Sequence, residues 1–174
     1  MLNDGEIMTF GETRLQALHM PGHSRGHMCF HFLNERIIFT ADLDLVKAGP
    51  YYGDRDSDVD DVISSLERLA RIDVDTYLTA HGKIGIYEGN PDHVKKYLDI
   101  IYQREDRLMT FLSQGAKTLR EIADQGIIYG KRKVTGAWDL TVSERHMMEK
   151  HLKRLTRLKK VQEDDGFFFL GGEP

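Results

Sequence analysis

Apolar and polar residues alternate along the first 43 residues in four short runs, separated by polar or glycine-containing turns. Alternation with a period of two predicts half-buried β-strands. The runs are residues 6–10, 13–20, 26–33 and 35–43. In the third run Phe30 and Phe32 share one face and Cys29 lies on the other. Four consecutive strands predict an antiparallel or mixed sheet.

The pattern then changes to a helical period in two segments, with a short buried strand at residues 76–82 between them. The first helix opens with Ser57 or Asp58 as N-cap. Its inward stripe consists of Val59, Val62, Ile63, Leu66, Leu69 and Ile72. The second begins at Asn90, with Pro91 at the first helical position. Strands and helices together predict an α/β (α+β) fold for this part.

Residues 104–174 have a different rhythm, with three helical segments followed by two extended arms around Asp165 and Gly166. Asp-Gly between two strands is a hairpin signal. Three helices and a hairpin are the plan of a small winged-helix domain. The last helix carries an apolar stripe that we expect to pack inside this domain: Met148, Leu152, Leu155 and Leu158.

Charge divides the chain at nearly the same place. The whole chain has a net charge of −4, but residues 1–103 carry −7, residues 104–160 carry +7 and residues 161–174 carry −4. We therefore predict two domains, 1–103 and 104–174. No Pro/Gly linker separates them, so a continuous helix or a tight connection is expected there.

Composition excludes some classes of protein. The sequence contains no apolar run long enough to span a bilayer and no basic-then-apolar leader. The single cysteine, Cys29, excludes an internal disulfide and suits a reducing compartment. These features predict a cytoplasmic protein without a membrane partner.

The segment HMPGHSRGHMCFH places a histidine at every fourth position: His19, His23, His27 and His31. That spacing would stack them on one face of a helix. Pro21 and Gly22 exclude a helix here, since proline lacks the required N–H and glycine weakens helices. The segment is predicted to be strand, tight loop and strand. The four rings then point in different directions, and at most one or two serve the same site.

Three potential ligands each come at the end of a predicted strand and begin a loop: His23, Asp42 and His81. Rigid sheets often present ligands from such positions. Histidine and aspartate together suit zinc, manganese or iron. Each residue alone would more often be a hydrogen-bonded loop residue, but the three in this order predict a metal site.

The chain also resembles a known family. HMPGHSRGH is similar to the H-T-P-G-H-T-x-G-H signature of the metallo-β-lactamase superfamily, FTADL to its strand ending in Gly-Asp, and AHGKI to its last Gly-His-Gly motif. The resemblance implies the second half of an αββα sandwich in residues 1–103. It further implies that His23 binds a first metal, that Asp42 bridges two metals with a catalytic role, and that His81 binds the second.

Residues 104–170 resemble the winged-helix tail of the superfamily's glyoxalase II-like and endoribonuclease-like branch, through LREIADQGIIYGK and MMEKHLKRLTRLKKV. Two departures matter. Ala41 replaces the usual glycine before the bridging aspartate. The family's first motif, H-x-H-x-D-H, does not occur in the chain. We therefore expect divalent metal, zinc or else manganese or iron, to be absent or weakly bound in the chain alone.

The remaining candidates have simpler expected roles. His19, His27 and His31 are expected to be structural, with His27 bracing the loop by hydrogen bonds. The helical residues His93, His146 and His151 are expected to be solvated or half-buried. Tyr51 and Tyr52, in the loop after Asp42, suit substrate contact and packing equally. A basic loop at Lys131, Arg132 and Lys133 is a candidate nucleic-acid contact or an ordinary solvated surface.

Two functions remain open. The first is a metal-dependent hydrolase that uses a metal-activated water on a thioester, another ester or a phosphodiester, inactive without its H-x-H-x-D-H half. The alternative is a nucleic-acid-binding or interaction module that uses the basic winged helix on a degenerate scaffold, with RNA as a possible ligand. Half a sandwich exposes an apolar sheet face, so we expect either a homo-oligomer or a partner that supplies the missing N-terminal half.

Overall fold

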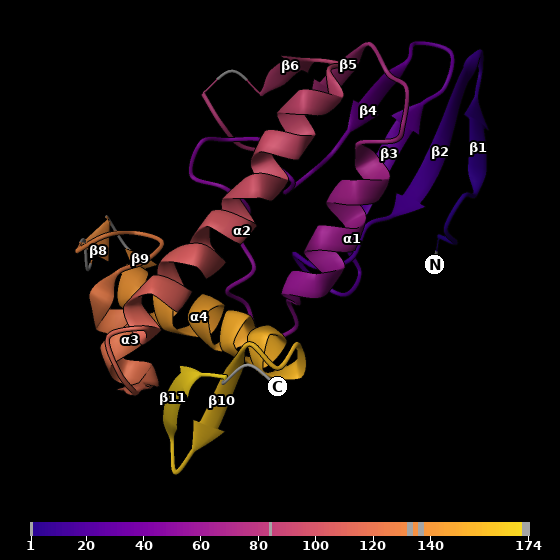
Figure 1. The fold of residues 1–174 in the computed structure, drawn as a ribbon. Helices are drawn as coiled ribbons and strands as arrows, with labels where there is room; N and C mark the ends of the chain where they lie inside the picture. The colour runs from indigo at the N-terminus through magenta and orange to yellow at the C-terminus, as the bar shows by residue number, and fades with distance from the viewer. Residues whose placement is uncertain (1, 84, 132–133, 136–137, 172–174) are drawn as a thin grey trace. The chain divides into compact units, whose positions relative to one another are not determined.

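A computed structural model describes residues 2–83, 85–131, 134–135 and 138–171 (Figure 1). The chain divides into two compact units. Met1–Tyr52 and Asp56–Ile101 form the first, called here the sheet unit. Gly53–Arg55 and Tyr102–Pro174 form the second, called the helical unit. The sequence-based boundary after residue 103 stays a prediction.

The sheet unit is built on a six-stranded sheet in the order β1-β2-β3-β4-β5-β6. Its strands are β1 (Ile7–Phe10), β2 (Thr13–His19), β3 (Met28–Phe32), β4 (Ile37–Phe39), β5 (Thr76–Leu78) and β6 (Ile86–Glu88). Neighbours are antiparallel, except that β4 and β5 run parallel. A parallel pair needs a crossover connection, and here it contains α1 (Val59–Leu69).

One face of this sheet is covered by α1 and by the first part of α2 (Pro91–Leu112) (Figure 1). Leu18 pairs with Cys29 and Ile38 with Tyr77 on that face, and all four side chains are buried. The helix α1 begins where Asp58 accepts hydrogen bonds from the N–H groups of Asp60 and Asp61. The predicted stripe is buried from Val59 to Leu69, whereas Ile72 lies beyond the end of the helix and is half-buried.

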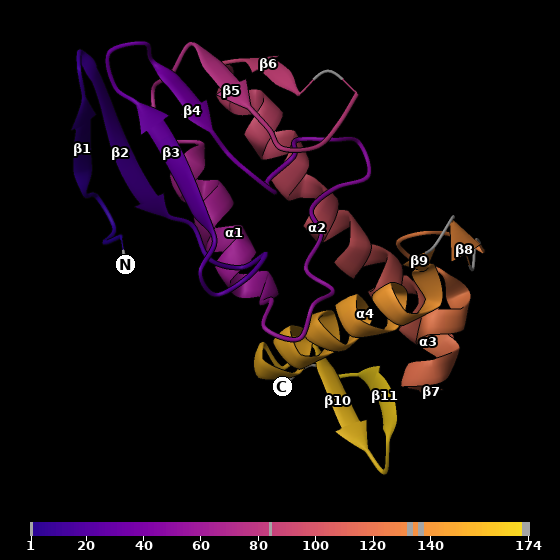
Figure 2. The same cartoon turned by 180° about the vertical axis from the view of Figure 1, so that it is seen from behind.

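The opposite face of the sheet is also apolar. The register places six half-buried side chains there: Leu15, Phe30, Phe32, Ile37, Phe39 and Leu78. Phe10 and Ile86 extend this face at its two edges and are 62% and 59% exposed. Figure 2 shows the strands from this side, with no described helix of the sheet unit in front of them. We call this surface the open sheet face.

The helical unit contains the end of α2, α3 (Leu119–Gln125) and α4 (Leu140–Arg157), followed by a hairpin of β10 (Val161–Asp164) and β11 (Phe167–Leu170). A two-residue strand, β7 (Lys117–Thr118), pairs with β11. The strands β8 (Val134–Thr135) and β9 (Trp138–Asp139) pair with each other. The core of this unit consists of Leu108, Leu112, Ile122, Ile127, Met148, Leu152, Leu155 and Val161.

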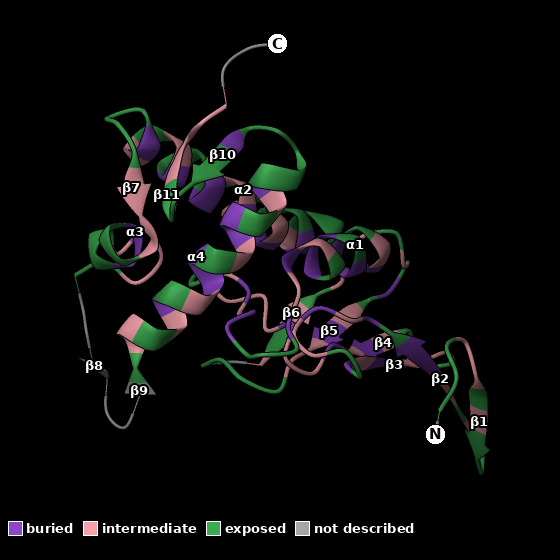
Figure 3. Ribbon diagram, turned by 90° about the horizontal axis from the view of Figure 1, so that it is seen from below, coloured by how far each residue is buried: buried purple, intermediate pink, exposed green. Residues whose placement is uncertain are grey.

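Several sequence predictions for this part are confirmed at the level of elements. α2 is continuous across the predicted junction. Asp165 and Gly166 have φ values of 48° and 77°, as a two-residue turn with both central residues left-handed requires. The structure adds a capping box of Thr118 and Glu121 at the start of α3. Figure 3 shows α4 with buried and exposed faces along its length.

Two predictions for α4 are wrong. Leu158 is 40% exposed rather than packed inward, because the helix ends at Arg157 and Leu158 is its cap. His151 is fully buried rather than solvated or half-buried, and its Nδ1 lies 3.3 Å from Glu105 Oε1. Both are consequences of tertiary contacts that the helical period does not report. None of the described helices is both long and apolar enough to span a membrane.

Candidate metal centre

The loop that carries His23 is tied to the start of α1. The Asp58 N–H donates to Gly22 O at 2.9 Å, and the Ser57 hydroxyl donates to His23 O at 2.6 Å. Gly22 has φ of 127°, and a Cβ there would lie 2.3 Å from Val62 N. The loop therefore approaches the helix so closely that only glycine fits at this position. His23 is held at a fixed place beside the end of the sheet.

Asp42 lies in the turn after β4. Ala41 precedes it with φ of 49°, a left-handed conformation that glycine adopts without strain. The resemblance had shown alanine replacing the family's glycine here, and the backbone shows the conformation that it must adopt. The turn is held by the Ala80 N–H, which donates to Ala41 O at 2.9 Å, and by the Thr40 hydroxyl, which donates to Leu43 O at 2.8 Å.

His81 follows β5, and because β4 and β5 are parallel, the loops after them leave from the same edge of the sheet. The His81 N–H donates to Asp44 Oδ1 at 3.0 Å, and the Thr79 hydroxyl donates to His81 O at 2.7 Å. The parallel pair thus brings Asp42 and His81 together although 39 residues separate them.

The three predicted side chains meet at Asp42. Asp42 Oδ1 lies 3.0 Å from His81 Nε2, and Asp42 Oδ2 lies 3.9 Å from His23 Nε2. The side chains of His23, Asp42 and His81 are 21%, 34% and 68% exposed. Each carboxylate oxygen therefore faces one imidazole, at a place that solvent can reach.

Hydrogen bonding fixes which nitrogen of His23 is available. His23 Nδ1 lies 3.2 Å from Tyr51 O, and a carbonyl can only accept, so Nδ1 carries the proton. In the neutral ring Nε2 then has a free lone pair, and Nε2 is the atom that faces Asp42. Metal-binding histidines commonly donate their other N–H to a backbone carbonyl in this way.

His27 braces the site through hydrogen bonds of both ring nitrogens, as the sequence predicted. Its Nδ1 donates to Met20 O at 2.8 Å, and its Nε2 accepts the Asp42 N–H at 3.3 Å. Burial lowers the pKa of His27 and outweighs the Met20 hydrogen bond that raises it. The ring is therefore neutral and bridges the His23 loop to the Asp42 turn.

Asp44 is a functional candidate that the sequence reasoning missed. Its carboxylate holds the His81 backbone, and the Tyr97 hydroxyl accepts the Asp44 N–H at 3.3 Å. Burial raises the pKa of Asp44, although the hydrogen bond from the His81 backbone opposes this. The available signal was its spacing, since Asp44 comes two residues after Asp42 in the same turn.

The other predicted residues lie elsewhere or pack. The Tyr51 ring is 5.9 Å from the His23 ring, whereas Tyr52 is fully buried, which favours packing over substrate contact for Tyr52. His19 is turned away, with Nε2 2.8 Å from Arg25 O. In the basic loop Lys131 is exposed, while the predicted contacts Arg132 and Lys133 lie outside the described residues.

The donor set fits part of a divalent metal site. Two ligands at about 2.0–2.1 Å from one metal lie roughly 3–3.5 Å apart. The His81–Asp42 distance of 3.0 Å meets this, and the His23–Asp42 distance of 3.9 Å is somewhat longer. Each metal would receive one histidine and one carboxylate oxygen. Within the described ranges no cluster of three or more His, Cys, Asp or Glu side chains has the arrangement of a complete site.

Known proteins with similar sequences or structures belong to the metallo-β-lactamase superfamily. Residues 1–81 match the family model of the metallo-β-lactamase superfamily. The chain is 34% identical over 76 residues to acyl-coenzyme A thioesterase MBLAC2 of Homo sapiens. This match covers 41% of this chain and 25% of the relative. It is 31% identical over 139 residues to an atrochrysone carboxyl ACP thioesterase of Pseudocercospora fijiensis, covering 75% of this chain and 38% of the relative.

Among solved structures, a metallo-β-lactamase family protein from Thermus thermophilus superposes on 97% of this chain with a TM-score of 0.80 and 22% identity. The match covers 53% of that protein. The chain therefore spans about half or less of the length of the proteins that it matches.

Proposed function

Since the chain belongs to the metallo-β-lactamase superfamily through residues 1–81, we propose that His23, Asp42 and His81 form the metal-binding part of a divalent-metal-dependent hydrolase that acts on thioesters. The observation that carries the proposal is the position of Asp42, which turns one carboxylate oxygen toward each histidine. Zinc is the expected metal, with manganese or iron as alternatives, because imidazole and carboxylate ligands suit all three.

The residues of the chain have distinct tasks in this mechanism. His23 would hold one metal through Nε2, His81 the other, and Asp42 both. When bound, such a metal pair lowers the pKa of a water molecule toward neutrality and polarises the carbonyl under attack. His27 fixes the Asp42 backbone, and Asp44 fixes the His81 backbone. The Tyr51 carbonyl keeps the proton of His23 on Nδ1.

A thioester is the substrate class that the relatives favour over other esters and phosphodiesters. The two curated relatives above are named as thioesterases of acyl-coenzyme A and of an acyl carrier protein. In both substrates a phosphate-bearing carrier holds the acyl group through sulfur. A metal pair would supply an activated water and polarise the carbonyl of such a thioester.

The chain supplies two ligands to each metal, so the remaining ligands are proposed to come from a second polypeptide or from an N-terminal half with the H-x-H-x-D-H motif. Metal affinity grows with each deprotonated ligand held in place. We therefore expect negligible turnover by the 174 residues alone. The open sheet face is the proposed surface for that half or for a second copy of the chain.

The test is hydrolysis of palmitoyl-coenzyme A, followed by release of the free thiol, with zinc or manganese present. The chain alone should be near background. It should become active when the preceding half of a superfamily relative is added or fused. Activity of that complex should fall at least about a hundredfold in H23A and D42N, and should persist in H19A, whose ring is turned away. Full activity of D42N in the complex would refute the proposal.

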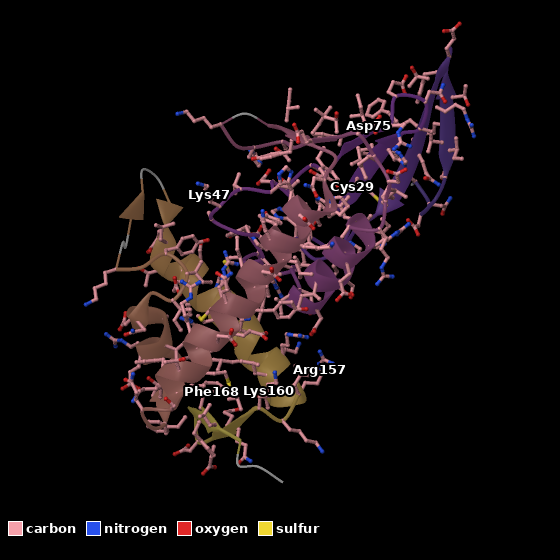
Figure 4. All side chains as sticks on the ribbon, turned by 45° about the horizontal axis from the view of Figure 1, so that its top comes forward. Cys29, Lys47, Asp75, Arg157, Lys160 and Phe168 are labelled. Carbon is pink, nitrogen blue, oxygen red and sulfur yellow. The ribbon has the colours of Figure 1, made fainter. Side chains whose placement is uncertain are left out.

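A nucleic-acid-binding winged helix remains the second candidate. Arg157 and Lys160 are exposed where α4 ends, as Figure 4 marks, and Lys153 is exposed on the same helix. These residues belong to the part of the chain with a net charge of +7. Binding of a short RNA that weakens steeply with salt, without thioester turnover in any assembly, would favour this function instead.

A further inference from the structure

A second concave site lies in the sheet unit beside the candidate metal centre. This pocket has a volume of about 510 Å³. Its walls come from the loop after β4, the loop after β5, β6 and the first turns of α2. The lining residues are Leu45, Val46, Lys47, Lys83, Tyr87, His93, Lys96, Tyr97 and Ile100. We call it the lysine pocket.

Three lysines from three separate segments line this pocket: Lys47, Lys83 and Lys96. Lys47 lies on the long loop after β4, where Figure 4 marks it. Among the residues that the structure describes, none of the three ammonium groups has an ion pair or hydrogen bond. The described lining contains no carboxylate, so the lining itself carries a net positive charge. Such a pocket suits an anion with several negative charges.

The rest of the lining is apolar or aromatic. Leu45, Val46 and Ile100 supply aliphatic surface. The Tyr87 ring packs edge-on against His93, with ring centroids 6.1 Å apart, and His93 Nδ1 donates to Glu88 O at 3.2 Å. These contacts hold two aromatic side chains in place. The pocket therefore combines positively charged lysines with an apolar surface that suits an uncharged part of the same ligand.

The pocket adjoins the metal centre directly. A Cβ added to Gly82, the residue after His81, would lie 3.2 Å from Val46 Cγ1 and 3.5 Å from the Tyr87 hydroxyl. On the other side, the Tyr97 hydroxyl accepts the N–H of Asp44, whose carboxylate holds the His81 backbone. A ligand in the pocket would therefore lie next to the His81 loop.

We propose that the lysine pocket binds the phosphate end of a phosphorylated thioester carrier, with the carrier's stem on Leu45, Val46 and Ile100. This inference rests on the proposed thioesterase function and adds the location of the carrier. Phosphate is favoured over a single carboxylate because one carboxylate would neutralise only one of the three lysines. Lysine binds phosphate as a point charge without the strict geometry that arginine requires.

The test is calorimetric titration of the full 174-residue chain with coenzyme A in EDTA, so that no metal-dependent step contributes. We expect binding that weakens with salt, since the contacts are ionic. The triple variant K47Q/K83Q/K96Q should weaken it about tenfold, the sum of three exposed ion pairs. The matched control is K95Q, which changes the adjacent exposed lysine on α2 outside the lining.

Titrations with phosphopantetheine and with coenzyme A distinguish the two possible sources of the phosphate. Equal affinity for phosphopantetheine and coenzyme A would support the pocket with a single phosphate as its ligand. Tighter binding of coenzyme A would support it with the nucleotide diphosphate as its ligand. Failure of both to bind, or equal binding by the wild type and the triple variant, would overturn the inference. D42N should bind coenzyme A normally, so loss of the metal function and loss of this pocket are distinguishable.

Discussion

Gly22 determines how closely the loop with His23 approaches α1. A Cβ at Gly22 would meet the backbone of Val62, which cannot move without disturbing the helix. At Gly26, in the same motif, an added Cβ would meet nothing within 4 Å, and the backbone is not left-handed. The two glycines of HMPGHSRGH therefore have different physical roles, one steric and one merely permissive.

We predict that G22A lowers the free energy of unfolding by about 3 kcal/mol or more, through backbone overlap and left-handed strain. G26A should change it by less than about 0.5 kcal/mol. Urea unfolding followed by circular dichroism would measure both. Equal effects of the two substitutions would show that the close contact at Gly22 is not a structural requirement.

His151 is buried between charged groups of the helical unit. Glu105 Oε1 lies 3.3 Å from its Nδ1 and 3.0 Å from Arg154 Nε. Burial lowers the pKa of His151, and its contact with Glu105 opposes this shift without reversing it. Arg104 and Arg154 lower it further. His151 is therefore neutral in the folded protein at neutral pH.

The sign of the pH dependence follows from this shift. A histidine whose folded pKa lies below its unfolded value of about 6.5 favours the folded state above pH 6.5, and that stability is lost as pH falls toward the folded pKa. We predict that H151Q loses less unfolding free energy than the wild type between about pH 7.5 and about 5.5. The pKa values of His27 and His31 are also lowered, but both groups are present in H151Q and in the wild type, so the difference between the two proteins reports on His151. An identical pH dependence in both proteins would contradict it.

At the scale of elements, periodicity in the sequence located the strands β1–β4, the helix α1 and the terminal hairpin, because each has a regular apolar pattern. It missed β6, whose three residues include an exposed Ile86 and Glu88 and show no period. The positions of His23, Asp42 and His81 could be predicted from the sequence, because each residue follows a strand that has a recognisable apolar pattern. The contact of Asp44 with His81 and the burial of His151 beside Glu105 could not be predicted, because the partners lie 37 and 46 residues apart in the sequence.

The basic loop before β8 tests whether the helical unit binds nucleic acid. Lys131 is exposed, so the combined change of Lys131, Arg132 and Lys133 to alanine should alter the unfolding free energy by less than about 0.5 kcal/mol. If this loop is the contact, affinity for RNA should fall for all sequences, with a weaker salt dependence. Filter binding at two salt concentrations would measure this. RNA binding that does not fall in the triple variant would exclude the loop as the contact.

At the scale of the whole molecule, the open sheet face is an apolar surface that no described helix of the sheet unit covers. Its half-buried aromatic and aliphatic residues would gain about 25 cal/mol for each Å² of apolar surface removed from water. Monomeric proteins seldom expose contiguous apolar surface of this kind. The face therefore favours association, either with another polypeptide or with a second copy of the chain.

We predict that the isolated chain is a dimer or larger at micromolar concentration, measured by light scattering. F30K, at the middle of the open sheet face, should shift it toward monomer with its circular dichroism spectrum retained. V142K, which changes a residue that is 50% exposed on α4, should not. A monomeric wild type at this concentration would contradict the prediction.

The most direct measurement of the central claim is a zinc titration of the isolated chain and its single variants by calorimetry. We predict weak binding, with a dissociation constant in the micromolar range or above, because each metal receives only two ligands from the chain. H23A, D42N and H81A should each weaken it at least about tenfold, whereas H19A should bind as the wild type does. Zinc binding that is unchanged in D42N would contradict the account, since both proposed metal positions use that carboxylate.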